Sequence, residues 1–323
     1  MAVMIIGVGI VGSQIARILV EKGERPVLMD RSPQLTALGE IVDLSRVVLI
    51  EGDVLQPFSL AEAIRRNKVT EIVHLAGNPM FTIGAQRHPY AAIQLNIMGT
   101  VNVLEAARLE GVKRVVVASS NVLNHHIEGG EGKGDPAKEE ANARPITIYA
   151  ACKQAIENLG LNYARWFNVD FIAVRYGAVA GPWGGVGGGG PSNVFRAMVQ
   201  AALKGEVALI PTSRMEWVYS KDAAQGTVLA LEAGALRRRV FNMTMGRLNG
   251  PEEITAALNA VVPGVKVKAS MSTDGSPALQ DNKYASDLSA AKEHVGYEPK
   301  YQMPEAVRDM AEWLRSRPAA GAL

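Results

Sequence analysis

Apolar and polar positions follow two recurring patterns along the first half of the chain. Short runs rich in Val and Ile predict buried strands over Ala2–Ile6, Pro26–Met29, Val47–Ile50, Glu71–Leu75, Arg114–Ala118 and Asp170–Arg175. Longer stretches of helical periodicity fill the gaps between them. Right-handed crossovers place such helices on both faces of a parallel sheet. The pattern therefore predicts an α/β fold with a doubly wound parallel sheet of the Rossmann type.

The second half of the chain is less regular. Its segment Gly181–Pro191 is so rich in glycine that we expect a mobile loop without regular structure. Further elements are expected near Ser192–Leu203, Val207–Ile210, Lys221–Glu232, Arg239–Met243, Pro251–Val261 and Pro304–Arg315. We expect residues 1–177 to form the Rossmann domain, with 211–243 returning to it. Residues 178–210 and 244–323 are expected to form a smaller substrate-binding lobe.

Composition excludes several classes of protein. Of the 323 residues, 48% are hydrophobic and 20% charged, and 34 basic side chains nearly balance 32 acidic ones, which argues against a nucleic-acid partner. The apolar start, Met1–Gly12, lacks a basic beginning and is interrupted by glycine, so it predicts neither a signal peptide nor a membrane span. The single cysteine, Cys152, fits a reducing cytoplasm. No ligand spacing predicts a metal site.

A glycine-rich turn follows the first predicted strand. Gly7-Val-Gly-Ile-Val-Gly12 opens a helix, so its backbone can approach a pyrophosphate at the helix N-terminus. Asp30 ends the next strand, where a carboxylate accepts from a ribose 2′-hydroxyl and repels a 2′-phosphate. We therefore expect NAD, although Arg31 keeps NADP as the alternative. Asp53 is either an adenine contact or a turn-forming aspartate.

Tyr149 and Lys153 are four residues apart on a predicted helix, so their side chains share one face. An ammonium beside a phenol lowers the phenol pKa, which would let Tyr149 exchange a proton with a substrate alcohol. Ser119 and Ser120 follow the strand Arg114–Ala118, at the edge where parallel strands gather around a ligand. Ser120 is the expected hydroxyl donor to the substrate oxygen. Without Tyr149 and Lys153, an ordinary turn would be the better interpretation of the serine pair.

Together these residues resemble a known family, the extended short-chain dehydrogenases/reductases, also called the NAD-dependent epimerase/dehydratase family. The resemblance covers nearly the whole chain. It rests on the glycine turn, Gly52-Asp53, His74-Leu-Ala-Gly77, Asn96-Ile-Met-Gly-Thr100, Val112–Ser120, Tyr149-Ala-Ala-Cys-Lys153, Val174-Arg-Tyr176, Gly181-Pro182, Trp217–Asp222, Val240-Phe-Asn242 and Gly296-Tyr-Glu-Pro299.

The resemblance implies a complete site. Lys153 would also hold the nicotinamide ribose, and Tyr176 and Val179 would lie near the nicotinamide. The predicted cofactor contacts are Gly7, Gly9, Ile10, Val11, Gly12, Asp30, Arg31, Asp53, Val54, Leu75, Ala76, Gly77, Asn96, Ser119, Tyr149, Lys153, Tyr176 and Val179. Members of the family often form homodimers through two long helices, here near His88–Arg108 and Ile148–Phe167.

Two positions depart from the pattern of members that act on nucleotide sugars. Ala178 and Met215 stand where those members carry an asparagine and an arginine that hold diphosphate. Arg214, one residue away, could compensate. We therefore expect an NAD-dependent oxidoreductase for a secondary alcohol or carbonyl of a sugar-like or small hydroxylated substrate. The alternatives are a nucleotide-sugar epimerase or dehydratase with tightly held NAD, and a non-catalytic NAD(P)-sensing protein. The predicted substrate contacts are Asn78, Ser120, Asn121, His125, Tyr149, Trp183, Asn193, Arg214 and Trp217.

Overall fold

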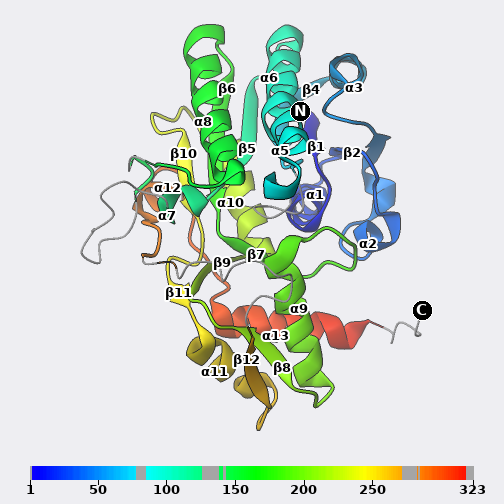
Figure 1. Ribbon diagram of the computed structural model, residues 1–323. Helices are drawn as coiled ribbons and strands as arrows, with labels where there is room; N and C mark the ends of the chain where they lie inside the picture. The colour runs from blue at the N-terminus through cyan, green and yellow to red at the C-terminus, as the bar shows by residue number, and fades with distance from the viewer. Residues whose placement is uncertain are drawn as a thin grey trace.

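A computed structural model describes residues 2–77, 85–125, 138–140, 143–270, 282 and 284–317. Its main element is a seven-stranded parallel sheet with the order β10-β6-β5-β4-β1-β2-β3 (Figure 1). The strands are β1 (Ala2–Ile6), β2 (Val27–Asp30), β3 (Val48–Glu51), β4 (Val69–His74), β5 (Arg114–Ser120), β6 (Asp170–Tyr176) and β10 (Val240–Met243). The strand order reverses between β1 and β4, which is where ligands bind in doubly wound sheets.

Helices cover both faces of this sheet, as the periodicity predicts. One face packs against α1, α10 and α12, and the other against α3, α6 and α8. Their bounds are α1 (Ile10–Glu21), α3 (Pro57–Arg66), α6 (Gly99–Glu110), α8 (Ile148–Phe167), α10 (Ser220–Glu232) and α12 (Ser289–Val295). Shorter elements are α2 (Leu35–Gly39), a 3-10 turn over Leu44–Arg46, α5 (Pro89–Ile93), a π-helical turn over Gln94–Met98 and α7 (Val122–His125). The fold class predicted from the sequence is confirmed.

A second hydrophobic core is formed by elements that lie below the large sheet in Figure 1. It is enclosed by a three-stranded sheet, a two-stranded sheet and three helices. These elements are β7 (Ala178–Ala180), β8 (Ala208–Pro211), β9 (Met215–Tyr219), β11 (Leu248–Asn249), β12 (Val267–Ser270), α9 (Gly189–Leu203), α11 (Pro251–Val261) and α13 (Met303–Ser316). The segment 211–243 is divided, because β9 pairs in the small sheet whereas α10 and β10 pack on the large one.

Several elements differ from those expected. Helix α9 begins at Gly189, inside the segment expected to lack regular structure, because the first helical turn needs no amide donors and tolerates Gly190 and Pro191. Strands β7, β9, β11 and β12 were not expected, since each is short and gains its pairing from distant residues. In the described part of the chain, none of the helices has both the length and the apolar character that a bilayer crossing requires.

Candidate active site

The glycine turn joins β1 to α1 at the carboxyl edge of the sheet. Gly7 adopts φ +93°, and a Cβ on it would lie 2.6 Å from the Ala76 nitrogen, while a Cβ on Gly12 would lie 2.3 Å from the Gly7 oxygen. A Cβ on Gly9 would meet nothing within 4 Å. Two glycines therefore permit the close packing of the turn, and the third leaves its outer side open to a ligand. Ile10 and Val11 start the helix, whose N-terminus favours phosphate.

Asp30 lies beside this turn. Its Oδ2 accepts from the Val8 amide at 2.8 Å and its Oδ1 from the Ser32 amide at 2.9 Å. Each oxygen retains a second lone pair, so the oriented carboxylate can still accept from a ribose hydroxyl. The neighbouring Arg31 is exposed. Asp53 accepts from the Leu55 amide at 2.9 Å, which is the turn-forming arrangement left open by the sequence.

The residues that follow β4 lie against the glycine turn. The amides of Leu75 and Ala76 both donate to the Ile6 carbonyl, at 2.7 and 2.9 Å. Asn96 lies in the π-helical turn and is 2% exposed, and its Nδ2 donates to the Ala92 carbonyl at 2.9 Å. A Cβ on Gly77 would lie 3.3 Å from Asn96 Oδ1. In the described part of the chain, that buried oxygen has no hydrogen-bond partner.

The π-helical turn that contains Asn96 is held by Thr100 and, through Thr100, by His74. The sequence interpretation placed neither residue in the site. Thr100 Oγ1 donates to the Asn96 carbonyl at 2.6 Å and therefore accepts from His74 Nε2, which lies 3.1 Å away. Burial lowers the pKa of His74 to about 3, with a smaller effect from Lys153. His74 is thus a neutral donor. The position of His74 at the end of β4, at the carboxyl edge of the sheet, was the sequence signal that could have placed it near the site.

Ser120, Tyr149 and Lys153 come together at the carboxyl ends of β5 and β6. All three are buried, and Lys153 Nζ lies 5.6 Å from the centroid of the Tyr149 ring and donates to the Ala118 carbonyl at 2.8 Å. A hydrogen bond joins the Ser120 hydroxyl to the Tyr149 phenol. Helix α8 starts one residue before Tyr149, where Thr147 Oγ1 accepts from the Ala150 amide at 3.2 Å. The cap thus places Tyr149 in the first turn of α8, and Lys153 follows one turn later on the same face.

The electrostatics of the pair differ from the sequence expectation. Burial raises the pKa of Tyr149 to about 12, although the hydrogen bond from Ser120 lowers it. Burial also lowers the pKa of Lys153 to about 8, against weaker attraction from Cys152 and Glu157. The expected lowering of the Tyr149 pKa by Lys153 is therefore wrong for the protein alone, because desolvation disfavours both charges in this cleft.

The predicted substrate contacts lie in several environments. Asn121 and His125 follow Ser120, whereas Trp217 is fully buried and packs against Phe195 with ring centroids 5.6 Å apart. Arg214 lies 3.0 Å from Glu253, and Asn193 is exposed on α9. Asn78 lies outside the described residues.

Tyr176, Val179 and Trp183 come from the segment that begins at the carboxyl end of β6. Trp183 is 2% exposed and belongs to the core cluster that contains Val8, Ile10 and Val11. The Tyr176 hydroxyl is hydrogen-bonded to Thr227, so it faces α10, and Val179 lies on β7. Val54 is buried in the core on the other face of the sheet, and Ser119 Oγ donates to the buried carboxylate of Glu157.

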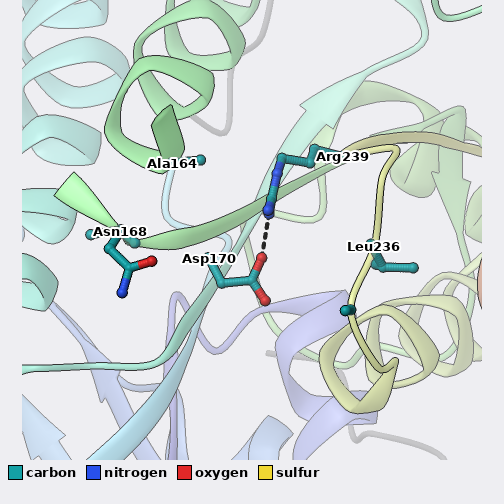
Figure 2. Close-up of a pocket in the computed structure, with 7 residues that line it drawn as sticks. Ala164, Asn168, Asp170, Leu236 and Arg239 are labelled. Carbon is teal, nitrogen blue, oxygen red and sulfur yellow. Dashed lines mark hydrogen bonds and ion pairs between the residues drawn. The ribbon is translucent and has the colours of Figure 1, made fainter. Parts of the chain in front are cut away.

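A pocket at the opposite edge of the sheet is separate from these residues. Figure 2 shows Asp170, at the start of β6, paired with Arg239, beside Ala164, Asn168 and Leu236. The amino ends of the strands lie here, whereas Ser120 lies at the carboxyl end of β5. The described residues contain no group of His, Cys, Asp or Glu arranged to hold a metal ion.

Known proteins share this architecture over the whole chain. The family model described as "NAD dependent epimerase/dehydratase family" matches residues 3–244. UDP-glucuronate 4-epimerase 3 of Arabidopsis thaliana is 24% identical over 330 residues, covering 94% of this chain and 74% of the relative. UDP-glucose 4-epimerase of Thermus thermophilus, solved with NAD, superimposes with a TM-score of 0.80 at 24% identity, covering 98% and 99% of the two chains. A partial-consensus L-threonine 3-dehydrogenase gives 0.81 at 25% identity, with the same coverage. The glycine turn, the Tyr149–Lys153 helix and the family match across most of the chain make this protein a member of the NAD-dependent epimerase/dehydratase family, an enzyme family of the extended short-chain type.

Proposed function

We propose that this protein is an NAD-dependent oxidoreductase that acts on a secondary alcohol or carbonyl of a small hydroxylated substrate. The observation that carries the chemistry is that Ser120, Tyr149 and Lys153 meet in one buried cluster at the carboxyl edge of the sheet, the edge at which the glycine turn also lies. A hydroxyl donor, a phenol and an ammonium in this arrangement match the needs of proton and hydride transfer at an alcohol.

Each of the three side chains has a distinct part in the proposed reaction. Tyr149, as phenolate, takes the proton of the substrate hydroxyl, and Ser120 donates a hydrogen bond to the same oxygen as it becomes a carbonyl. NAD, when bound, would supply the acceptor for the hydride of the carbinol carbon. Lys153 Nζ, 5.6 Å from the centroid of the Tyr149 ring, supplies positive charge that favours the phenolate and so opposes the desolvation that raises the Tyr149 pKa in the protein alone. In the reducing direction Tyr149 returns its proton to the carbonyl oxygen.

The substrate class rests on the diphosphate-binding positions. Met215 cannot provide a charge-assisted contact, Ala178 cannot donate a hydrogen bond through its side chain, and Arg214 is already paired with Glu253. These features support a substrate without a nucleotide. The similarity to an L-threonine 3-dehydrogenase points the same way, since its named substrate is a small secondary alcohol.

A nucleotide-sugar epimerase is the second candidate. It is supported by the similarity to UDP-glucuronate 4-epimerase 3 over 94% of this chain. In such an enzyme the same three residues would serve a hydride that returns to the substrate. The two candidates differ in whether NADH accumulates and in whether NAD is tightly held.

A substrate panel separates the two candidates. The purified protein is incubated with NAD and, separately, with L-threonine, other small hydroxy acids, free sugars, UDP-glucose and UDP-glucuronate. Net formation of NADH with a substrate that lacks a nucleotide supports the oxidoreductase. Conversion of a UDP-sugar to its epimer without net NADH supports the epimerase and overturns the proposed substrate class.

We further propose a homodimer. Helices α6 and α8 lie side by side at the top of Figure 1. They expose large apolar side chains that a monomer would leave in water: Leu109, Trp166 and Phe167. A second copy of the chain is the proposed partner of this surface.

A further inference from the structure

Ser120 lies between two residues whose side chains are both anchored to buried carboxylates. Ser119 Oγ donates to Glu157 on α8. Asn121 Nδ2 donates to Glu216 Oε2 at 3.1 Å, and the Asn121 amide donates to the Tyr176 carbonyl at 2.9 Å. The backbone that carries the Ser120 hydroxyl is therefore fixed on both sides of the residue.

Glu216 is an unusual anchor, because it is a carboxylate that is 1% exposed. Its Oε1 accepts from Thr244 Oγ1 at 2.7 Å and from the Ser286 amide at 2.9 Å, and its Oε2 also accepts from Ser286 Oγ at 2.7 Å. Within the described residues, the structure gives it no ion pair with a basic side chain. Four neutral donors thus hold it, at a desolvation cost that an apolar residue would avoid.

The two carboxylates belong to one hydrogen-bonded network. Glu157 forms a buried ion pair with Arg175 at 2.8 Å, and Arg175 NH1 donates to Asn124 Oδ1 at 2.8 Å. Asn124 Nδ2 in turn donates to Ser286 Oγ at 2.8 Å. Ser286 is the residue that donates to Glu216. The network thus reaches both neighbours of Ser120, Ser119 and Asn121. Through Glu216 on β9, it also joins the large sheet to the smaller lobe.

We infer that Glu216 is a positioning residue: by holding Asn121, it fixes the Ser120 hydroxyl where it meets Tyr149 and the substrate oxygen. Small errors in such a position are costly, because hydrogen-bond strength and proton transfer both depend on alignment. The inference deepens the proposed function and, for its kinetic consequence, rests on it. It assigns no contact with substrate to Glu216.

The first test needs no substrate. Glu216→Gln keeps the size of the side chain but replaces one acceptor oxygen by a donor. Amide hydrogen exchange is then measured over residues 119–124, where the amides of Asn121, Val122 and Asn124 are hydrogen-bonded. We expect exchange there to become about tenfold faster in the variant. Unchanged exchange would overturn the inference, whether or not any substrate is known.

The matched control is Asp309→Asn in the same lobe. Asp309 accepts from Tyr219 and Lys221, both at 2.6 Å, and belongs to α13. It undergoes the same carboxylate-to-amide change outside the network around Ser120. We expect it to leave exchange over residues 119–124 unchanged. Equal acceleration in both variants would show that Glu216 acts only through the general stability of the lobe.

The second test uses the substrate found in the panel. We expect Glu216→Gln to lower kcat about tenfold with little change in the KM for NAD. In a Ser120→Ala background the same substitution should change kcat by less than about twofold, because the hydroxyl it positions is gone. A tenfold loss in both backgrounds would contradict the positioning role. Absence of turnover in the wild-type protein would instead overturn the proposed function, and hydrogen exchange would still decide the role of Glu216.

Discussion

Gln34 and Val186 are 152 residues apart in sequence and are joined by two hydrogen bonds. Gln34 Nε2 donates to the Val186 carbonyl at 2.9 Å, and the Val186 amide donates to Gln34 Oε1 at 2.7 Å. Gly184 lies in the same loop, where a Cβ would be 2.6 Å from both Arg317 and Glu40. The glycine loop is therefore docked on the segment that follows Asp30. This docking places it alongside the predicted adenosine end of the cofactor groove.

We expect the two hydrogen bonds between Gln34 and Val186 to slow the release of cofactor. Two exposed hydrogen bonds contribute about 1 kcal/mol each, so Gln34→Ala should speed NADH dissociation by about five- to thirtyfold. Stopped-flow fluorescence of bound NADH measures the rate. Gln200→Ala, an exposed glutamine on α9, is the control. An unchanged dissociation rate in Gln34→Ala would show that the loop does not retain the cofactor.

Tyr149→Phe tests the proton transfer. Removing the phenol should lower kcat by about 10²- to 10⁴-fold, because proton transfer to or from the substrate oxygen loses its catalyst. NADH binding should change little. Tyr163→Phe removes a hydroxyl that donates to Glu105 at 2.6 Å and should leave kcat intact. Full activity of the Tyr149 variant with the identified substrate would refute the assignment.

His74 should make the fold sensitive to acid. Its pKa is lowered from 6.5 to about 3, so between these values the unfolded chain binds more protons than the folded one. Stability is then lost as the pH falls below 6.5. We expect His74→Gln, which can still donate to Thr100, to reduce the loss between pH 7 and pH 5 by roughly 2 kcal/mol. Urea unfolding at the two pH values measures this, with exposed His88→Gln as the control.

Gly160 allows α8 to pack closely against β6. A Cβ on it would lie 2.2 Å from the Phe171 ring, so we expect Gly160→Ala to destabilise the protein by about 1–3 kcal/mol. A Cβ on Gly190, in the first turn of α9, meets nothing within 4 Å. Gly190→Ala should therefore change the free energy of unfolding by less than about 1 kcal/mol. Equal losses in urea unfolding would contradict this packing argument.

A charged substitution on α8 tests the proposed dimer surface. Trp166 is 72% exposed on α8, and burying a glutamate in an apolar interface is costly. Sedimentation should show a dimer for the wild-type protein and a monomer for Trp166→Glu. Phe58 on α3 is 90% exposed and lies outside this surface, so Phe58→Glu should remain dimeric. A monomeric wild-type protein would dismiss the proposal.

Sequence patterns predicted those features that depend on local periodicity or spacing. The parallel strands, the helices between them, the glycine turn and the i, i+4 relation of Tyr149 and Lys153 are all of this kind. Strands such as β9 and β12 could not be predicted in the same way, because each is short and its partners are remote in sequence. Glu216 gave no signal for the same reason.

The amino-acid sequence by itself determined the fold class, through its periodicity, and the shared helix face of Tyr149 and Lys153, through their spacing. Its ordered motifs carried the resemblance that identified the family. Only the tertiary structure decided the electrostatics and the anchoring. Burial raises the pKa of Tyr149 to about 12, against the lowering expected from Lys153 alone. Likewise, the network from Glu157 to Glu216 unites residues from five separate segments of the chain: α8, β6, α7, the stretch at Ser286 and β9. Desolvation and long-range hydrogen bonds depend on which distant residues surround a group, and local sequence does not specify that.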